Sequence, residues 1–296
     1  YGLGSDNDDL PWFVVMNANV DAMQFPQAPG WESGFLPPRY QGTIVSANDG
    51  IRNIAMPASY DASSRRSQLD LIAGLNQKHL RNVGENSELE ARIHSYELAY
   101  RMQASAPSLF DLSRETAETR RLYGVDTKET ALMGQHCLVA RRLVEAGVRF
   151  VQVRFGGWDA HNQLEANHRR QALASDQPIA ALLIDLKRRG LLEDTLVIWG
   201  GEFGRTPTME TKNKGRDHSP TAFTYWLAGG GAKGGTIIGE TDPIGYTPTA
   251  RPVRPSDFHA TLLHALGVDQ NELYYTHHGR KELVTVLGGD VVQEVF

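Results

Sequence analysis

The sequence is poor in cysteine, in long hydrophobic runs and in clustered positive charge. Its 296 residues include one cysteine, Cys137, which excludes an internal disulfide framework and a thiolate metal cluster. No apolar stretch approaches the roughly 18–20 residues of a membrane-spanning helix, so no membrane span is expected. The net charge is −5 without any sustained basic run, which gives nucleic-acid binding no electrostatic support.

Common catalytic motifs are missing as well. No Gly-x-Ser-x-Gly segment is present, so a Ser-His-Asp hydrolase of that kind has no support. The segment GGGAKGG at 229–235 lacks the Gly-Lys-Ser/Thr ending and the following helix of a phosphate-binding loop, and we interpret it as a turn. His259 and His264 lie in an expected helix among core residues and are interpreted as packing or helix-surface histidines.

The chain does have the pattern of an α/β protein. Residues 64–147 form a mainly helical region, and beyond it the hydrophobic pattern alternates between strands and helices. Such alternation predicts a mostly parallel sheet with helices on both faces, within a single domain spanning 1–296. The expected strands are 10–17, 148–155, 194–200 and 221–230, and the expected later helices are 177–190 and 254–267, the last with Ser256 as N-cap.

The first polar cluster is GGWDAHNQ at 156–163, directly after an expected strand. Asp159 and His161 offer an oxygen and a nitrogen ligand two residues apart, and on an extended turn such side chains can point the same way. Mixed Asp/His ligation suits zinc, manganese or iron better than calcium. The alternative is a polar loop with a surface histidine.

Two further clusters follow, GGEFGRTP at 200–207 and GRDHSPTAF at 215–223. Glu202 can bind a metal or act as a base, and Arg205 can hold an anionic oxygen. Asp217 can bind a metal or orient the imidazole of His218, with Arg216 beside them. The alternatives are a Glu-Arg ion pair in a tight turn and an ion pair within a loop.

Together the three clusters hold the groups of a metal-assisted hydrolase. Ligands bind beyond the carboxyl ends of strands in such sheets, so we expect the clusters to converge there. Two Asp, one Glu, two His and two Arg suit two metal ions and an anion with a tetrahedral centre, such as a phosphate or sulfate ester.

The same segments carry a family resemblance. YGLGSDNDDLPWFVV, GGWDAHN, TLVIWGGEFGRTP, GRDHSPTAF and RPVRPSDFHATLLHALGVD closely resemble the family called domain of unknown function 1501, which belongs with the alkaline phosphatase and sulfatase superfamily. The resemblance implies a doubly wound α/β fold, here with a helical insertion. It also implies a bimetal site that hydrolyses phosphate or sulfate esters through a Ser, Thr or modified Cys nucleophile.

By this similarity Asp159 and His161 are a metal-binding pair and His218 is the final metal ligand. A second Asp-His pair is expected where this chain has Glu202-Phe203, so one His ligand is missing. The implied cofactors are divalent metal ions, zinc first, with manganese, iron or calcium as alternatives. The implied substrate is a phosphate or sulfate ester of a small molecule or glycan, and the implied location is exported or periplasmic.

The start of the chain limits the resemblance. The superfamily's first metal-binding Asp and its nucleophile precede the equivalent of residue 1, so we expect an N-terminally incomplete chain and assign no nucleophile. Two hypotheses follow. The leading one is a metal-dependent phosphatase or sulfatase in which Asp159, His161, Glu202, Asp217 and His218 serve the metal and Arg205 and Arg216 stabilise the ester oxygens. The rival is a non-catalytic relic of the fold that acts as a binding or structural subunit.

Overall fold

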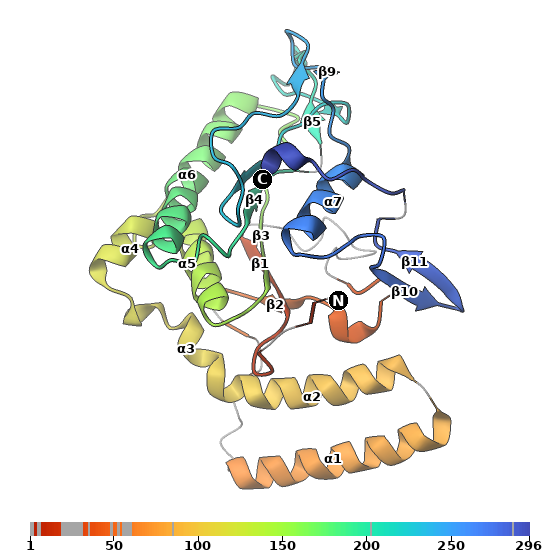
Figure 1. Ribbon diagram of the computed structural model, residues 1–296. Helices are drawn as coiled ribbons and strands as arrows, with labels where there is room; N and C mark the ends of the chain where they lie inside the picture. Colours follow the sequence, from red (N-terminus) through yellow and green to blue (C-terminus); the bar gives the residue numbers. More distant parts are fainter. Residues whose placement is uncertain are drawn as a thin grey trace. The chain divides into compact units, whose positions relative to one another are not determined.

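The computed structural model of the chain has a mixed α/β fold (Figure 1). It describes residues 3–4, 7–18, 32–34, 36–47, 50–51, 54, 61–84, 86–201, 203–285 and 287–296. The chain divides into two compact units. Unit 1 contains the described residues of Leu3–Gly156 with Gln177–Ile179, and unit 2 contains those of Gly157–Asp176 with Ala180–Phe296.

A parallel sheet of three strands forms the centre of unit 1. Its strand order is β2 (Thr43–Val45), β1 (Phe13–Ala18) and β3 (Phe150–Phe155), and both pairings of β1 are parallel. Val14, Val15 and Met16 are each at most 1% exposed, because β1 is covered on both faces as the middle strand of a parallel sheet must be. The strand expected at 10–17 is therefore confirmed with a shift of its bounds.

Five α-helices of unit 1 lie between β2 and β3 in the sequence. The last of them, α5, contributes Val139, Ala140 and Leu143 to the same hydrophobic core as Val14 and Met16. Within the described part of the chain, every helix is too short or too polar to cross a lipid bilayer. The helices are α1 (Ala62–Val83), α2 (Ser87–Ser105), α3 (Pro107–Phe110), α4 (Ala117–Tyr123) and α5 (Ala131–Glu145), with 3₁₀ turns η2 (Pro38–Tyr40) and η3 (Leu112–Arg114).

Helices α1 and α2 form a hairpin, which Figure 1 shows as two helices side by side. Arg66 of α1 donates to both carboxylate oxygens of Glu97 of α2 at 2.9 and 3.1 Å. Asn86 caps α2 by accepting a hydrogen bond from the backbone N–H of Leu89 at 2.9 Å. A side-chain cap of this kind satisfies one of the free N–H groups of the first turn.

Unit 2 contains two helices and several two-stranded ribbons. Strand β4 (Val197–Trp199) pairs antiparallel with β7 (Trp226–Ala228), so the strands expected at 194–200 and 221–230 are present but shorter. The other ribbons are β5 (Gly204–Arg205) with β6 (His218–Ser219), β8 (Glu240–Thr241) with β9 (Pro248–Ala250), and β10 (Tyr274–His277) with β11 (Arg280–Leu283), and η4 (Gln293–Val295) is a 3₁₀ turn near the end of the chain.

Helices α6 and α7 differ from their sequence predictions at their first residues. Helix α6 (Leu164–Arg188) begins thirteen residues before the predicted start at 177 and continues through the buried Pro178. Helix α7 (Pro255–Ala265) has Arg254 as its N-cap, so the prediction of Ser256 as N-cap was wrong. Asp257 explains the shift, because its carboxylate accepts the backbone N–H of Arg254 at 2.9 Å and fixes Pro255 as the first helical residue.

Candidate metal centre

The loop that carries Asp159 and His161 is fixed by side chains of α6. Gln171 donates through Nε2 to the carbonyl of Gly157 at 3.3 Å, and His168 contacts the carbonyl of Trp158 at 3.1 Å. Gly157 has φ +91°, and a Cβ there would lie 2.2 Å from Nε2 of Gln171. Glycine is therefore required at 157, both for its backbone conformation and for the space that Gln171 occupies.

A short ribbon places Arg205 beside His218. The two residues are directly opposite each other in the β5–β6 pair, so their side chains lie on one face of the ribbon. Thr206 extends the pairing, because its backbone N–H donates to the carbonyl of Asp217 at 2.9 Å and its hydroxyl accepts the backbone N–H of Asp217 at 3.2 Å.

Backbone hydrogen bonds join this ribbon to the first loop. The N–H of Arg216 donates to the carbonyl of Ala160 at 3.2 Å, and the N–H of Leu164 donates to the carbonyl of Lys214 at 2.9 Å. A Cβ at Gly215 would lie 2.0 Å from the carbonyl carbon of His161, so the two backbones touch where no side chain fits. The contact at Gly215 brings the segments 157–163 and 204–219 together.

Asp159, His161 and His218, the Asp-His-His triad, meet at their side-chain tips. Oδ1 of Asp159 lies 2.9 Å from Nε2 of His161 and 2.9 Å from Nε2 of His218. The two Nε2 atoms are 3.0 Å apart. Two imidazole nitrogens at this distance can both donate their lone pairs to one cation between them.

The triad has the donor set and the spacing of a metal site. Three ligands at about 2.1 Å from one ion lie about 3.0 Å apart at right angles and about 3.4 Å apart in a tetrahedron. The distances of 2.9, 2.9 and 3.0 Å match the first arrangement. Side-chain exposures of 56% for Asp159, 43% for His161 and 40% for His218 leave room for further ligands, as catalytic metal sites require.

Arg205 contacts the same carboxylate oxygen of Asp159 that faces the two histidines. Its Nη1 lies 2.5 Å from Oδ1 of Asp159, and its side chain is 18% exposed. Partial burial alone would raise the pKa of the Asp159 carboxyl, but hydrogen bonds from His218 and Arg205 and the positive charge of Arg205 outweigh it and lower the pKa. The carboxylate is therefore ionised, which is the form that binds a metal.

Aromatic packing orients His218. The ring of Phe203 lies 4.4 Å from the ring of His218 at an interplanar angle of 41°, and the guanidinium of Arg205 lies 5.9 Å from the centre of the Phe203 ring. Phe203 stands where the resemblance predicts a histidine ligand. Its apolar ring cannot bind a metal, but it packs against the imidazole of His218 and restricts its orientation, a role that the sequence motif did not reveal.

The remaining predicted site residues lie outside the triad or outside the described residues. Oδ1 of Asp217 is 3.9 Å from Nδ1 of His161, on the side of the ring opposite to the triad, and accepts the backbone N–H of His218 at 2.7 Å. Among the described residues Arg216 has no hydrogen-bond partner at its buried Nε. Glu202 lies outside the described residues. Of the five predicted metal ligands, Asp159, His161 and His218 come together in the described residues.

The arrangement can bind one divalent cation and place a guanidinium beside it. Neutral imidazole and carboxylate are the ligands for which zinc, manganese and iron compete, whereas calcium prefers oxygen alone. No curated protein and no solved structure matches the chain. The family profile described as protein of unknown function (DUF1501) matches residues 1–296, and the chain therefore belongs to the DUF1501 family.

Proposed function

We propose that this protein is a metal-dependent hydrolase of phosphate or sulfate esters, of the alkaline phosphatase and sulfatase type, with the doubly wound fold of that superfamily. The observation that carries the proposal is the triangle of ligand atoms from Asp159, His161 and His218, with edges of 2.9, 2.9 and 3.0 Å and Arg205 against it. A cation site beside a guanidinium is the combination that an anionic ester needs.

Each residue of the site then has one task. Asp159, His161 and His218 would hold the ion through one oxygen and two Nε2 nitrogens, which would require the proton of each ring on Nδ1. Asp217 faces Nδ1 of His161 from 3.9 Å and favours that tautomer electrostatically. The ion itself supplies Lewis-acid chemistry, polarising the ester and making an attacking group more acidic.

Arg205 binds the anionic oxygens of the ester. Its guanidinium pairs with Asp159 at 2.5 Å. With Asp159 serving as a metal ligand, the guanidinium of Arg205 would be available to contact two oxygens of a phosphate or sulfate at once. Those oxygens carry negative charge in the transition state, so a contact that tightens there would lower the barrier as well as the dissociation constant.

One observation favours a second function, that of a non-catalytic binding or structural subunit. The Arg205–Asp159 ion pair already supplies a cation to the carboxylate. If this pair is permanent, the triad is a polar network that needs no metal. The two proposals differ in metal content and in the effect of removing Arg205, since its loss exposes the triad to metal in the first case and disrupts the network in the second.

Metal content measured by elemental mass spectrometry tests the proposal. The protein is purified without chelator and without a metal-affinity column, and its turnover of 4-nitrophenyl phosphate and 4-nitrophenyl sulfate is then measured. We expect about one equivalent of zinc, manganese or iron per chain, with turnover of one ester that a chelator abolishes and the metal restores.

A matched pair of histidine variants assigns the metal to the triad. His161→Gln removes one ligand and is expected to lose both the metal and turnover. His79→Gln replaces an exposed histidine of α1 and is expected to retain both. Protein without metal, or metal retained by His161→Gln, would leave the non-catalytic subunit as the better account.

A further inference from the structure

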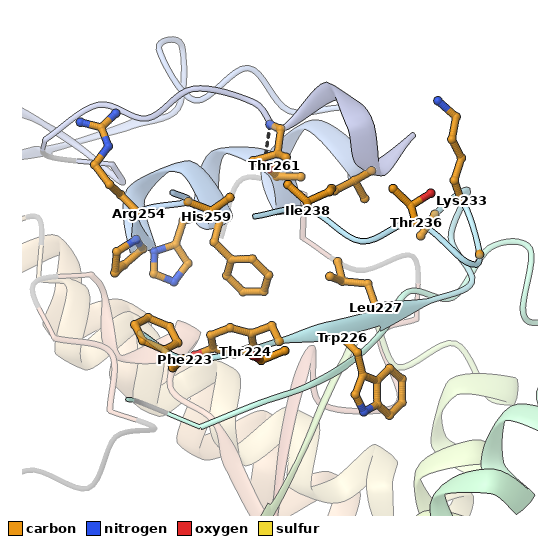
Figure 2. A pocket seen from close by; sticks show the side chains of 18 of the residues that line it. Phe223, Thr224, Trp226, Leu227, Lys233, Thr236, Ile238, Arg254, His259 and Thr261 are labelled. Atoms are coloured by element: carbon orange, nitrogen blue, oxygen red, sulfur yellow. Dashed lines mark hydrogen bonds between the residues drawn. The ribbon is translucent and has the colours of Figure 1, made fainter. Parts of the chain in front are cut away.

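A separate cavity lies elsewhere in unit 2, between β7, the glycine-rich segment 229–236 and α7 (Figure 2). Its volume of about 510 Å³ is within the range of about 300–1,000 Å³ that small-molecule sites occupy. Apolar side chains dominate its walls, among them Phe223, Leu227, Ile238 and Phe258. Figure 2 shows Leu227 and Trp226 on opposite faces of β7, with Leu227 on the face toward Ile238 and α7.

The walls of the cavity are fixed by specific contacts. The rings of Tyr225 and Phe258 stack at 4.5 Å with an interplanar angle of 26°, which joins the segment before β7 to α7. The buried hydroxyl of Thr261 donates to the carbonyl of Asp257 at 2.6 Å and accepts the backbone N–H of Val292 at 2.9 Å. The cavity is therefore preformed, and a ligand would not have to order it.

Two cationic side chains border the cavity, and they differ in charge balance. Arg254 is neutralised by Asp257, to which it donates at 2.8 and 3.1 Å. Lys233 is exposed at the opposite end, and no ion-pair partner for it is found in the described residues. Figure 2 shows its side chain at the rim. Lys233 therefore carries the uncompensated positive charge beside an apolar cavity.

Free backbone donors follow Lys233 directly. The N–H of Ala232 donates to the carbonyl of Gly229 and that of Lys233 to the carbonyl of Val295. For the next three N–H groups, those of Gly234, Gly235 and Thr236, no acceptor occurs among the described residues. Gly235 has φ +79°, and successive N–H groups around a left-handed residue form a concave site for an anion.

We propose that this cavity binds a small aromatic acid, with its ring system against Leu227, Ile238 and Phe258 and its carboxylate, sulfonate or phosphate on Lys233 and the three free N–H groups. Three observations combine in this assignment: the apolar volume, the unpaired lysine at one end and the unpaired amides beside it. Pairing of Arg254 with Asp257 directs the acidic group to the Lys233 end. The proposal is independent of the hydrolase function because it uses neither the triad nor a metal.

Two fluorescent probes that share an aromatic skeleton test the assignment on the full chain in the presence of a chelator. 8-Anilinonaphthalene-1-sulfonate carries an acidic group and N-phenyl-1-naphthylamine does not. We expect Lys233→Gln to weaken binding of the sulfonate by about 5- to 10-fold and to leave binding of the amine unchanged. Lys187→Gln, a change of an exposed lysine on α6, is the matched control and is expected to alter neither.

A second pair of variants locates the probe. Leu227→Trp and Ile238→Trp fill the cavity from two different segments and are expected to weaken both probes at least about 10-fold. Ile238 lies outside the strands, so its variant remains informative if Leu227→Trp fails to fold. Unchanged binding in a folded tryptophan variant, or equal effects of Lys233→Gln on both probes, would overturn the assignment. His218→Ala should leave both dissociation constants unchanged, which separates this test from that of the hydrolase.

Discussion

The sheet of unit 1 and the triad loops of unit 2 are held by different forces. Val14, Val15 and Met16 of β1 are at most 1% exposed and are stabilised by apolar burial. Asp159, His161 and His218 keep between 40 and 56% of their side-chain surface in solvent, and backbone hydrogen bonds between two loops position them. A change in the sheet therefore acts on folding, whereas a change in the triad should act on binding and spare the fold.

The largest effect is expected at the triad itself. His218→Ala removes one of three ligands and should weaken binding of zinc at least about 100-fold, equivalent to about 2.7 kcal/mol. Because the imidazole is 40% exposed, the thermal midpoint should fall by no more than about 3 °C. Competition with a chromophoric chelator gives the affinity. A variant that binds zinc as well as the parent protein would show that the triad is not the metal centre.

In unit 1 the largest expected effect is on stability, and it comes from a steric clash in α5. Gly134 lies inside α5, and a Cβ there would lie 2.3 Å from the carbonyl oxygen of the fully buried Tyr123. Gly134→Ala should therefore lower the free energy of unfolding by about 2 kcal/mol, although alanine is the better helix former. Urea denaturation followed by circular dichroism measures it. An unchanged or raised midpoint would contradict the close contact between α4 and α5.

An ion pair of unit 2, between the buried carboxylate of Asp257 and the exposed side chain of Arg254, should make stability depend on pH. Hydrogen bonds from the Arg254 side chain, opposed by burial and aided by the N–H groups of Asp290 and Arg254, hold the pKa of Asp257 well below its usual range. The folded-state pKa is below the unfolded value of about 3.9, so this stabilisation is complete at neutral pH. It is lost as the pH falls below about 4 towards the folded-state pKa.

Asp257→Asn should therefore lower the free energy of unfolding by about 2 kcal/mol at pH 7, and by less at pH 3, where the carboxyl of the unfolded chain is largely protonated while that of the folded protein is still ionised. Asp70→Asn, which changes an exposed partner of Arg66, is the matched control and should cost less than about 0.5 kcal/mol at either pH. Thermal denaturation at both pH values provides the comparison. A loss that is equal at pH 7 and pH 3 would mean that charge is not the cause.

A substitution at the contact between the two triad loops should lower metal affinity although it changes none of the three ligand residues. Gly215→Ala places a Cβ 2.0 Å from the carbonyl carbon of His161, so the loops must separate and the triangle must open. We expect zinc affinity to fall about 10-fold. Gly201→Ala introduces the same methyl group where no atom lies within 4 Å and should leave affinity unchanged. Equal affinities in the two variants would show that Gly215 does not position His161.

The features that depend on local pattern could be predicted from the sequence. The apolar runs around Val14 and Val197 are strands, and the helical periodicity around Val139 is α5. The predicted start of α6 was wrong, because the sequence pattern of residues 164–176 does not distinguish a helix from a loop. Their helical conformation is accompanied by contacts of Gln171 and His168 with the preceding loop. Local pattern predicts whether a segment is a helix or a strand, but not which distant residues it contacts.

The site shows the same division. Asp159, His161 and His218 could be selected because their residue types and their positions after strands match metal chemistry. Their mutual distances depend on the pairing of Arg205 with His218 and on the backbone contact at Gly215. Both join residues that no periodicity connects, so the sequence alone could not rank Asp217 below the triad.

The smallest effect is expected at Gly74, and it completes the comparison with Gly134. Both glycines lie inside helices, where alanine loses less backbone entropy on folding and favours the helix by about 0.5–1 kcal/mol. At Gly74 of α1 no atom lies within 4 Å of an added Cβ, so nothing opposes this gain and Gly74→Ala should raise the free energy of unfolding by that amount. Urea denaturation of both variants under the same conditions measures the sign of each change in the free energy of unfolding. Destabilisation by Gly74→Ala would require a neighbour over that face of α1, whereas opposite signs would show that packing, and not helix propensity, decides which helix glycines the fold requires.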